Sequence, residues 1–569
     1  MTKGREKKFH EQGGTFVKIK GFNKSVIVFT SIVLLAGTAL VGCAKKSETG
    51  ADGAAAEQKF RMLIASEPPS LDPGLAQDNN SSTVLRPIYD ALTRMDEKGE
   101  VKPGAAEKWD VSEDGLKYTF HLRKDAKWSN GDPVKASDFE FAWKRVLDPG
   151  MTPPAPYAYQ LYYIKNAEEY NTKKITDASQ IGVKAKDDFT LEVELKSPTP
   201  YFLSLVAFYT YIPLNEKAVK ANPKFASEAA TMVTNGPFLL KEWKHNDSLT
   251  LVKNDQYHSA KDVKLTEVNM KIMNDPGTML NMYNTNQIDW AGRPTNEFPV
   301  DQLPMLKKDP KINLQIKGIA STYYYEFNTK AEPFDNASIR KAFAMSIDRK
   351  AIVEKITQGD QQPAYGLVPQ GIRGESKTFR EEVKDDYFKE DIAEAKKLLE
   401  QGMKEKGYSK LPAVTLIYNK SEAHKKIAEA VVDMWRQNLG IDVKLEVQEF
   451  GVYIKNRQNG NFQIARAGWG ADYNDPMTYI DLMMTGGGNN NSKYSNADYD
   501  KLIKDAYGTS DQAKRMKAMA QAEKIMINDM PIMPIYYYTG IWAQKDYVKN
   551  VFVDYKGDVN FIYGSIEKK

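Results

Sequence analysis

A segment in the last quarter of the chain, RQNGNFQIARAGWGADYNDP at residues 457–476, holds residue types that could bind a charged, extended ligand. Its charged and aromatic members include Arg457, Arg466, Trp469, Asp472 and Tyr473. Gly468 and Gly470 alternate beside the tryptophan, and glycines let another backbone approach an exposed strand edge closely. A short peptide is a zwitterion, so inside a closed cleft its ammonium needs a carboxylate and its carboxylate needs a guanidinium. The same residues also fit a strand and turn whose charges are solvated or paired with one another.

Motifs of enzymatic catalysis are missing from the sequence. It contains no G-x-S-x-G elbow, no H-E-x-x-H helix, no phosphate loop and no dinucleotide fingerprint. The histidines after residue 42 are isolated from one another: His121, His245, His258 and His424. The single cysteine, Cys43, excludes a disulfide framework and any zinc site that needs two thiolates. The run Gly486–Asn491 lacks the Lys and Ser/Thr of a nucleotide loop and is predicted to form a surface turn. We expect no catalysis, no metal and no cofactor.

The N-terminal segment has the order of an export signal. Basic residues up to Lys24 precede an uncharged apolar run of eighteen residues at 25–42, which small residues end before Cys43. An uncleaved membrane anchor is the alternative, although eighteen residues lie at the short end of the spanning range. Both interpretations place the rest of the chain outside the cytoplasmic membrane. Residues 1–42 carry seven basic and two acidic groups, so the net charge of +4 leaves the remainder at −1, with no basic excess for nucleic acid.

The sequence predicts both strands and helices around the charged segment. At 569 residues and 41% hydrophobic content, the chain can form two to four structural units. Alternating apolar residues predict strands at 117–123 and 190–195. Apolar residues at helical spacing predict helices at 336–356, at 391–407 and at 422–439, the last with Ser421 as N-cap and Gly440 as its end, followed by a strand at 441–447. These patterns predict an α/β fold whose earlier half is richer in strands.

Several motifs occur in the same order as in a known family. The segment ARAGWGADYNDP resembles the signature around the ligand site of oligopeptide-binding proteins, the solute-binding components (family 5) of bacterial ABC peptide importers. The resemblance continues through PPSLDP at 68–73, PGAAEKWDV and the residues that follow it at 103–149, PYAYQL at 156–161, VTNGPFLLKEW at 233–243, STYYYEFN and the residues that follow it at 321–349, and YNKSEAHKKIA at 418–428. Leu40-Val41-Gly42-Cys43 is similar to a lipobox, at which cleavage frees a cysteine that receives a diacylglycerol. Two or more acyl chains give stable anchoring.

The resemblance implies an α/β, periplasmic-binding-protein-like fold (type II, cluster C) with three lobes and a ligand cleft between the two major lobes. The implied parts are a signal peptide at 1–42, a lipidated Cys43 with a flexible tether at 43–59, lobe I at 44–89, 216–317 and 540–569, an inserted lobe II at 90–215, and lobe III at 318–539. Such interleaving makes the crossings between lobes into hinges.

The resemblance also implies the role of individual residues. Asp472 matches the aspartate that pairs with the peptide α-ammonium, and Arg466 and Arg457 match arginines that receive the C-terminal carboxylate of ligands of different lengths. His424 matches a histidine used for a longer peptide. The other implied site residues are Tyr157 and Tyr538, which line the cleft, Trp469, which walls a side-chain pocket, and Gly468, Gly470 and Ser321, whose backbone groups pair with the ligand main chain.

As the resemblance implies, the protein would bind short peptides and deliver them to ABC permease subunits powered by cytoplasmic ATPases. It would do so as a monomer anchored by lipid to the outer face of a Gram-positive cell membrane, without binding nucleic acid. A pheromone or sensor receptor of the same fold and a binder of cell-wall (murein) peptides are the alternatives. Two departures from the family pattern leave room for a ligand with extra carboxylates: Gln77 replaces a cleft glutamate, and AGRPTNEF at 291–298 introduces Arg293. Arg293 fits either an ordinary surface position or a group that binds an acidic part of the ligand.

Overall fold

The computed structural model describes residues 56–97, 99–384 and 386–568, all of which belong to a unit that spans residues 55–569. The predicted signal peptide, Cys43 and most of the predicted tether lie outside the described residues. None of the helices in the described part is long and apolar enough to cross a membrane.

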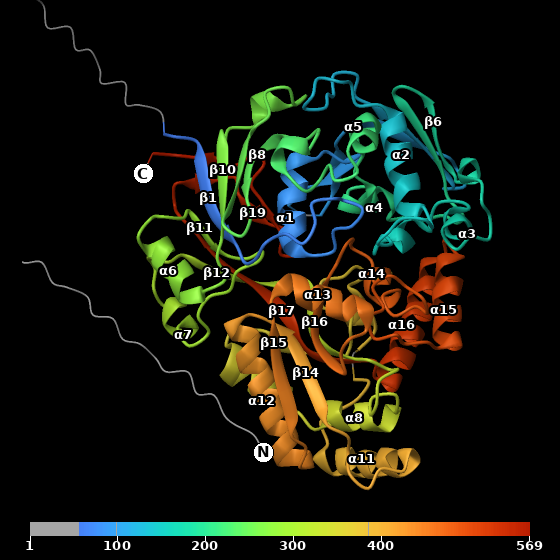
Figure 1. The fold of residues 1–569 in the computed structure, drawn as a ribbon, viewed down its shortest axis with the longest axis vertical. Coiled ribbons are helices and arrows are strands. Elements are labelled where there is room, and N and C mark those ends of the chain that lie inside the picture. The colour runs from blue at the N-terminus through green and yellow to red at the C-terminus, as the bar shows by residue number, and fades with distance from the viewer. Residues whose placement is uncertain (1–55, 98, 385, 569) are drawn as a thin grey trace, which may run out of the picture. The chain divides into compact units, whose positions relative to one another are not determined.

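A four-stranded sheet joins the first described strand to segments nearly 200 residues away. Its order is β1 (Lys59–Ile64), β10 (Glu267–Ile272), β9 (Ser248–Lys253) and β8 (Phe238–Lys244). β1 runs parallel to β10 and the other pairs are antiparallel. Helix α1 (Asn79–Ile88) lies beside this sheet and begins at Asp78, whose side chain caps the first turn (Figure 1).

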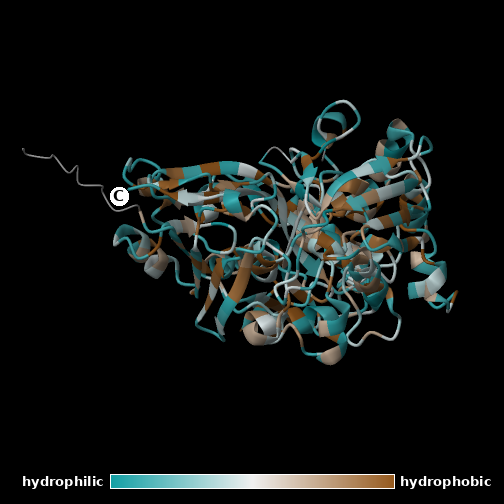
Figure 2. Ribbon diagram, turned by 90° about the horizontal axis from the view of Figure 1, so that it is seen from above, coloured by the Kyte–Doolittle hydropathy of each residue, from teal (hydrophilic) through white to brown (hydrophobic). Residues whose placement is uncertain are grey.

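A second four-stranded sheet is wholly antiparallel. Its order is β4 (Ala106–Val111), β5 (Lys117–Leu122), β7 (Thr190–Glu194) and β6 (Val183–Asp187). Helix α2 (Ala136–Leu147) packs on β6 and β7. The predicted strands at 117–123 and 190–195 are confirmed, because Tyr118, Phe120 and Leu122 are buried while their neighbours are not. Apolar and polar positions alternate along such strands in Figure 2.

The largest sheet has seven strands and carries the segment rich in charge. Its order is β11 (Trp290–Gly292), β17 (Ile532–Gln544), β12 (Leu314–Phe327), β16 (Ile464–Gly470), β14 (Val414–Asn419) and β15 (Val443–Gln448), with β13 (Gln362–Pro363) paired off β17. The long strands β12 and β17 run through the predicted crossings between lobes I and III, at 317/318 and 539/540. The exact lobe boundaries stay a prediction.

The pairing of β12 with β17 is interrupted where the two strands pass the predicted crossings. Gly318 pairs with Thr539, and the next pair is Thr322 with Tyr537, so β12 has two more residues in this interval than β17. The extra residues bond elsewhere: Ala320 N–H donates to Tyr555 O at 2.8 Å, and Ala320 O accepts from Ala471 N–H at 2.9 Å. This bulge turns Ser321 toward the end of β16, where it pairs with Gly470.

The structure confirms most of the predicted helix boundaries. Helix α11 (Ile392–Lys406) ends at Gly407, and α12 (Glu422–Leu439) begins at Ser421 and ends at Gly440. Both glycines adopt positive φ, as helix C-caps require. The predicted helix at 336–356 is interrupted: α8 (Ala337–Met345) stops at Ser346, and α9 (Arg349–Ala351), capped by the Asp348 side chain, follows and continues into a π-helical segment at Ile352–Thr357.

Candidate ligand-binding cleft

A cavity of about 350 Å³ is lined by the N-terminal turns of α1 and α12, by β16, by α13 (Phe450–Asn459) and by loops at 293–297 and 556–558. This volume lies within the range of ligand pockets, roughly 300–1,000 Å³. All ten residues predicted to contact a ligand line the cavity, as do Gln77 and Arg293. The fold therefore brings together the ten predicted residues from five separate stretches of sequence, although the role of each stays a prediction.

Strand β16 offers the cavity a row of backbone groups. Arg466, Gly468 and Gly470 line the cavity, whereas the alternate residue Ala467 is buried on the other face. Among the described residues, β16 pairs with β12 along its length but with β14 only at Ile464 and Ala465. The edge from residue 466 to residue 470 is thus open to an added extended chain.

Glycine at 468 keeps this edge accessible. A Cβ atom built there would lie 3.4 Å from Thr322 O and 3.4 Å from the Tyr538 hydroxyl, which is ordinary contact. The fold itself therefore does not demand glycine at this position. A side chain would instead occupy the space beside the open strand edge.

Asp472 lies at one end of the cavity with an incomplete set of partners. Its Oδ2 accepts a hydrogen bond from Gln160 Nε2 at 2.5 Å, and its own backbone N–H donates to Thr478 Oγ1 at 3.1 Å. Among the described residues, no cationic side chain lies within 4.0 Å of its carboxylate. Burial raises the pKa of Asp472 to about 7, against the opposing influence of Lys556. An ammonium group from a ligand would supply the missing partner.

The cations near Asp472 have other carboxylates as their direct partners. Arg86 pairs with Asp558 and lies 3.8 Å from Asp554, and Lys556 Nζ lies 3.6 Å from Asp558. Arg86, Lys556 and the more distant Arg293 all act on Asp558, and none of these cations lies within 4.0 Å of the Asp472 carboxylate. The ammonium of a zwitterionic ligand would neutralise the Asp472 carboxylate.

Aromatic rings form the wall next to Asp472. The buried ring of Tyr157 lies 6.1 Å from Trp469, 5.0 Å from Phe208 and 5.7 Å from Tyr209, measured between ring centroids. Trp469 Nε1 donates to Thr478 O at 2.7 Å, which fixes the indole in place. This wall suits a variety of apolar ligand side chains.

Arg466 lies at the other end of β16 and also lacks a counter-ion. Its Nη2 donates to the Tyr538 hydroxyl, and its guanidinium carbon lies 4.7 Å from the centroid of the Tyr323 ring. Its buried Nε has no hydrogen-bond partner, and no carboxylate of the described residues lies within 4.0 Å of it. A guanidinium held by rings in this way is ready to receive an anion.

Arg457 differs from Arg466 because it already has a partner. Its Nη2 and Nε bond both oxygens of Glu326 at 2.7 Å and 3.1 Å, and Glu326 is fully buried. The sequence analysis missed Glu326, since a counter-ion 131 residues away leaves no local pattern. Arg457 lines the cavity, but its bidentate face is occupied.

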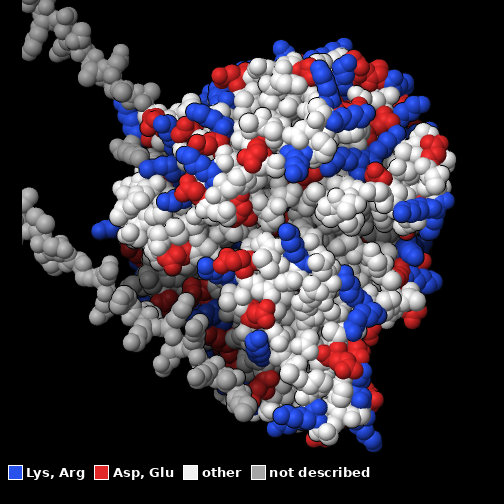
Figure 3. Space-filling view, in the orientation of Figure 1, with Lys and Arg blue, Asp and Glu red and all other residues white. Residues whose placement is uncertain are grey.

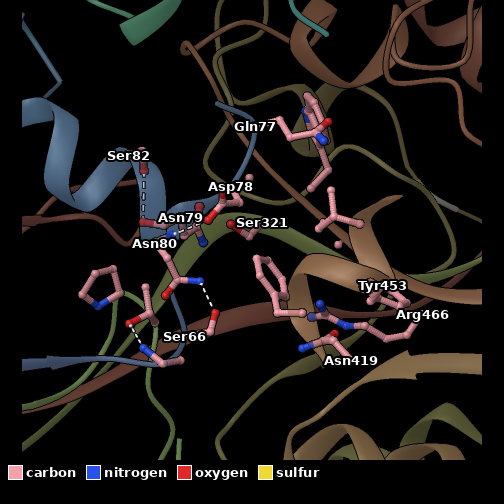
Figure 4. Close-up of a pocket in the computed structure, with 18 of the residues that line it drawn as sticks. Ser66, Gln77, Asp78, Asn79, Asn80, Ser82, Ser321, Asn419, Tyr453 and Arg466 are labelled. Carbon is pink, nitrogen blue, oxygen red and sulfur yellow. Dashed lines mark hydrogen bonds between the residues drawn. The ribbon is translucent and has the colours of Figure 1, made fainter. Parts of the chain in front are cut away.

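Three neutral side chains beside Arg466 have polar atoms without partners. The atoms are His424 Nδ1, Asn419 Oδ1 and the Tyr453 hydroxyl. His424 is only 6% exposed, and burial together with Arg466 lowers its pKa well below 6.5, so the ring is neutral at pH 7. Figure 4 shows Arg466, Asn419 and Tyr453 together on one side of the pocket, away from Asp78 and Asn80 at the start of α1.

The predicted surface turn at 486–491 is partly wrong. Residues 485–486 are exposed, but Asn489, Asn490 and Asn491 are buried. Asn490 Nδ2 donates to Met484 O at 2.9 Å and Tyr494 O at 2.8 Å, so the buried amide is satisfied. Asn489 and Asn491 line the cavity. A run of glycines and asparagines looks alike in sequence whether its amides face water or a cleft.

A group of metal ligands or a basic stripe on the surface would mark other kinds of site. No group of three or more His, Cys, Asp and Glu side chains there could hold a metal ion. On the face shown in Figure 3, basic and acidic side chains are interspersed rather than gathered into a basic stripe of the kind that binds nucleic acid.

Comparisons with known proteins show the family of the chain. Residues 100–491 match the family described as bacterial extracellular solute-binding proteins, family 5 (middle region). The oligopeptide-binding protein OppA of Bacillus subtilis (strain 168) is 44% identical over 545 residues, which cover 94% of this chain and 97% of that protein. The crystal structure of Haemophilus influenzae OppA in complex with the peptide RPPGFSPFR has a TM-score of 0.85 at 35% identity and covers 90% of this chain and 99% of that chain.

The chain therefore belongs to family 5 of the bacterial extracellular solute-binding proteins. Members of this family are solute-binding components of transporters rather than enzymes, and their fold is the α/β periplasmic-binding-protein-like fold. The unliganded open form of a periplasmic murein tripeptide-binding protein, MppA, has a TM-score of only 0.60 at 33% identity and covers 90% of this chain and 98% of that chain. The present structure thus resembles the peptide complex more than this open form.

Proposed function

We propose that this protein is a lipid-anchored extracellular receptor that binds short peptides in a closing cleft and delivers them to an ABC permease. The observation that carries the proposal is the pair of unpartnered charges at the two ends of one open strand edge. Asp472 supplies a carboxylate without a cation, and Arg466 supplies a guanidinium without a carboxylate. A zwitterionic peptide laid along residues 466–470 satisfies both.

The spacing of these charges sets the length of the peptide that can reach both of them. Arg466 and Asp472 are six residues apart, so their Cα atoms are at most about 20 Å apart at roughly 3.3 Å per residue. Both residues line the cavity, and their side chains take up part of this span, which leaves room for an extended peptide of about three or four residues. Longer ligands would have to place their carboxylate beyond Arg466, toward Arg457 and His424.

Recognition would be largely independent of ligand sequence. Main-chain hydrogen bonds to Gly468, Gly470 and Ser321 and the two terminal charges supply affinity, while the aromatic wall at Tyr157 and Trp469 admits different side chains together with water. Closure would bend the chain at the crossings near 317/318 and 539/540. The closed form, as a monomer, would then dock on permease subunits driven by cytoplasmic ATPases.

The proposed receptor is held at the membrane by a lipid anchor on Cys43. Cleavage before Cys43 and lipidation of its thiol would tether the receptor to the outer face of a Gram-positive membrane. Relatives of the chain also include a murein tripeptide-binding protein, which keeps cell-wall peptides among the candidate ligands.

The decisive experiment identifies the natural ligand. Mass spectrometry of small molecules released from the purified protein should find peptides with free amino termini, and calorimetry with the same peptides should give saturable binding. Release of sugars or metal complexes, with no binding of any peptide, would refute the proposal.

A further inference from the structure

A second guanidinium stands beside Arg466 at the carboxylate end of the cleft. The guanidinium carbon of Arg293 lies 5.8 Å from the centroid of the Tyr538 ring, whose hydroxyl accepts from Arg466 Nη2. The phenol of Tyr538 thus separates the two cations. A single peptide carboxylate at Arg466 leaves Arg293 without a carboxylate in direct contact.

The fold makes room for Arg293 and gives it few partners. Its Nη1 donates to Pro294 O at 3.3 Å, and its buried Nε has no hydrogen-bond partner. A Cβ atom at Gly557 would lie 2.7 Å from Arg293 Nη2, so the glycine there leaves space for the guanidinium. A guanidinium has five N–H donors, and among the described residues the one to Pro294 O is the single hydrogen bond that the Arg293 side chain donates.

Two carboxylates, those of Glu297 and Asp558, attract Arg293 from a distance and have closer partners of their own. Glu297 Oε2 accepts from Ser421 Oγ at 3.2 Å, at the positive N-terminus of α12, and burial raises the pKa of Glu297. Asp558 pairs with Arg86 and lies 3.6 Å from Lys556. Among the described residues, no carboxylate lies within 4.0 Å of the Arg293 guanidinium.

We propose that Arg293 forms a second carboxylate subsite, so that the receptor favours peptides with an acidic side chain at the last or the penultimate residue. The inference rests on the proposed function, in which Arg466 receives the terminal carboxylate. The ligand class it defines is the acidic peptide, whether the second carboxylate belongs to a common amino acid or to a cell-wall residue. Arg293 is a specificity-determining residue in this arrangement.

The test compares peptides that differ by one charge. Calorimetry with Ala-Glu-Ala and Ala-Gln-Ala, and with Ala-Ala-Glu and Ala-Ala-Gln, should show about tenfold tighter binding of the acidic member of at least one pair, as expected for a charge-assisted hydrogen bond. In Arg293→Gln this preference should vanish while the affinity for Ala-Ala-Ala changes less than about twofold. Arg293→Lys should keep part of the preference, since it keeps the charge but not the planar fork.

Arg436→Gln is a matched control, because Arg436 is exposed on α12 and pairs with Asp433 at 3.0 Å. The preference should survive in this variant. Equal affinity for the acidic and neutral peptides of both pairs would overturn the subsite while leaving peptide binding intact, and so would an acidic preference that persists in Arg293→Gln. Failure of every peptide to bind would instead refute the proposed function. Thermal unfolding of each variant shows whether it is folded. If Arg293→Gln is unfolded, the reduced acidic preference of Arg293→Lys tests the subsite instead.

Discussion

The affinity for free-amine peptides should fall steeply as pH drops below 7, because Asp472 must be ionised to bind an ammonium. In the unliganded protein, burial raises the pKa of Asp472 to about 7. Each pH unit below that value adds about 1.4 kcal/mol to the free energy of ionising the carboxylate. Binding at pH 5 should therefore be about a hundredfold weaker than the limit reached at higher pH.

Two titrating groups at the Arg466 end of the cleft, His424 and Glu297, do not mimic this profile. The pKa of His424 lies well below 6.5, so its ring remains neutral over most of the interval. The pKa of Glu297 is raised, and its protonation as pH falls removes a negative charge near Arg466, which strengthens carboxylate binding and has the opposite sign. Above about pH 8 the peptide loses its own ammonium, because α-amino groups have a pKa near 7.7–8.0.

The assay is calorimetry at half-unit steps from pH 5 to pH 8, with a tripeptide and its N-acetylated form, on the wild type and on Asp472→Asn. The wild type should show the decline only with the free-amine peptide. Asp472→Asn should weaken that peptide by about 2–5 kcal/mol at pH 7.5 and give a flat profile. A parallel decline for both peptides, or equal losses for both in Asp472→Asn, would show that Asp472 does not hold the ammonium.

Three further outcomes follow from the same geometry. Without ligand, Asp472→Asn should be more stable than the wild type by about 2–4 kcal/mol at pH 8, because there the buried carboxylate of the wild type is ionised and destabilises the fold. The difference should disappear near pH 4, where the carboxyl group is protonated in the folded protein. Chemical denaturation measures this difference, and a less stable variant at pH 8 would contradict the burial argument. Arg457→Met should lower the free energy of unfolding by about 3–5 kcal/mol because it strands the buried Glu326, and adding Glu326→Gln should restore most of the loss; an unchanged midpoint in the single variant would refute the pairing. Gly468→Val should weaken peptides by about tenfold or more with little change in stability, as calorimetry and melting can show together; unimpaired binding would mean that no ligand lies along this strand edge.

Elements with strong local signals could be predicted from the sequence. Helix α12 begins at Ser421 and ends at Gly440 because a hydroxyl caps its first turn and a glycine accepts positive φ at its end. The strand around Phe120 was equally clear, since alternation of apolar residues needs no knowledge of the partner strand. The α/β class followed from such local patterns.

Long-range pairing could not be predicted in this way. Nothing near Arg457 in the sequence reveals that Glu326 neutralises it, nor that Arg466 stays without a carboxylate. The interruption after Met345 likewise had no signal in the apolar spacing, which continues through Ile347. The resemblance to a family indicated which residues share the cleft, whereas only the three-dimensional arrangement separates the paired charges from the free ones.

The bulge between β12 and β17 has a mechanical consequence. Ser321 and Tyr538 lie within or next to the interval between the pairs Gly318–Thr539 and Thr322–Tyr537, and both face the cavity. If the two strands bend at this interval, Ser321 and Tyr538 move together. Ser321 lies near Gly470 and Tyr538 contacts Arg466, so the bending moves contacts at both ends of the bound peptide. The same segment therefore acts as the hinge and contacts the ligand. A ligand of the wrong length would prevent the cleft from closing, in addition to binding weakly.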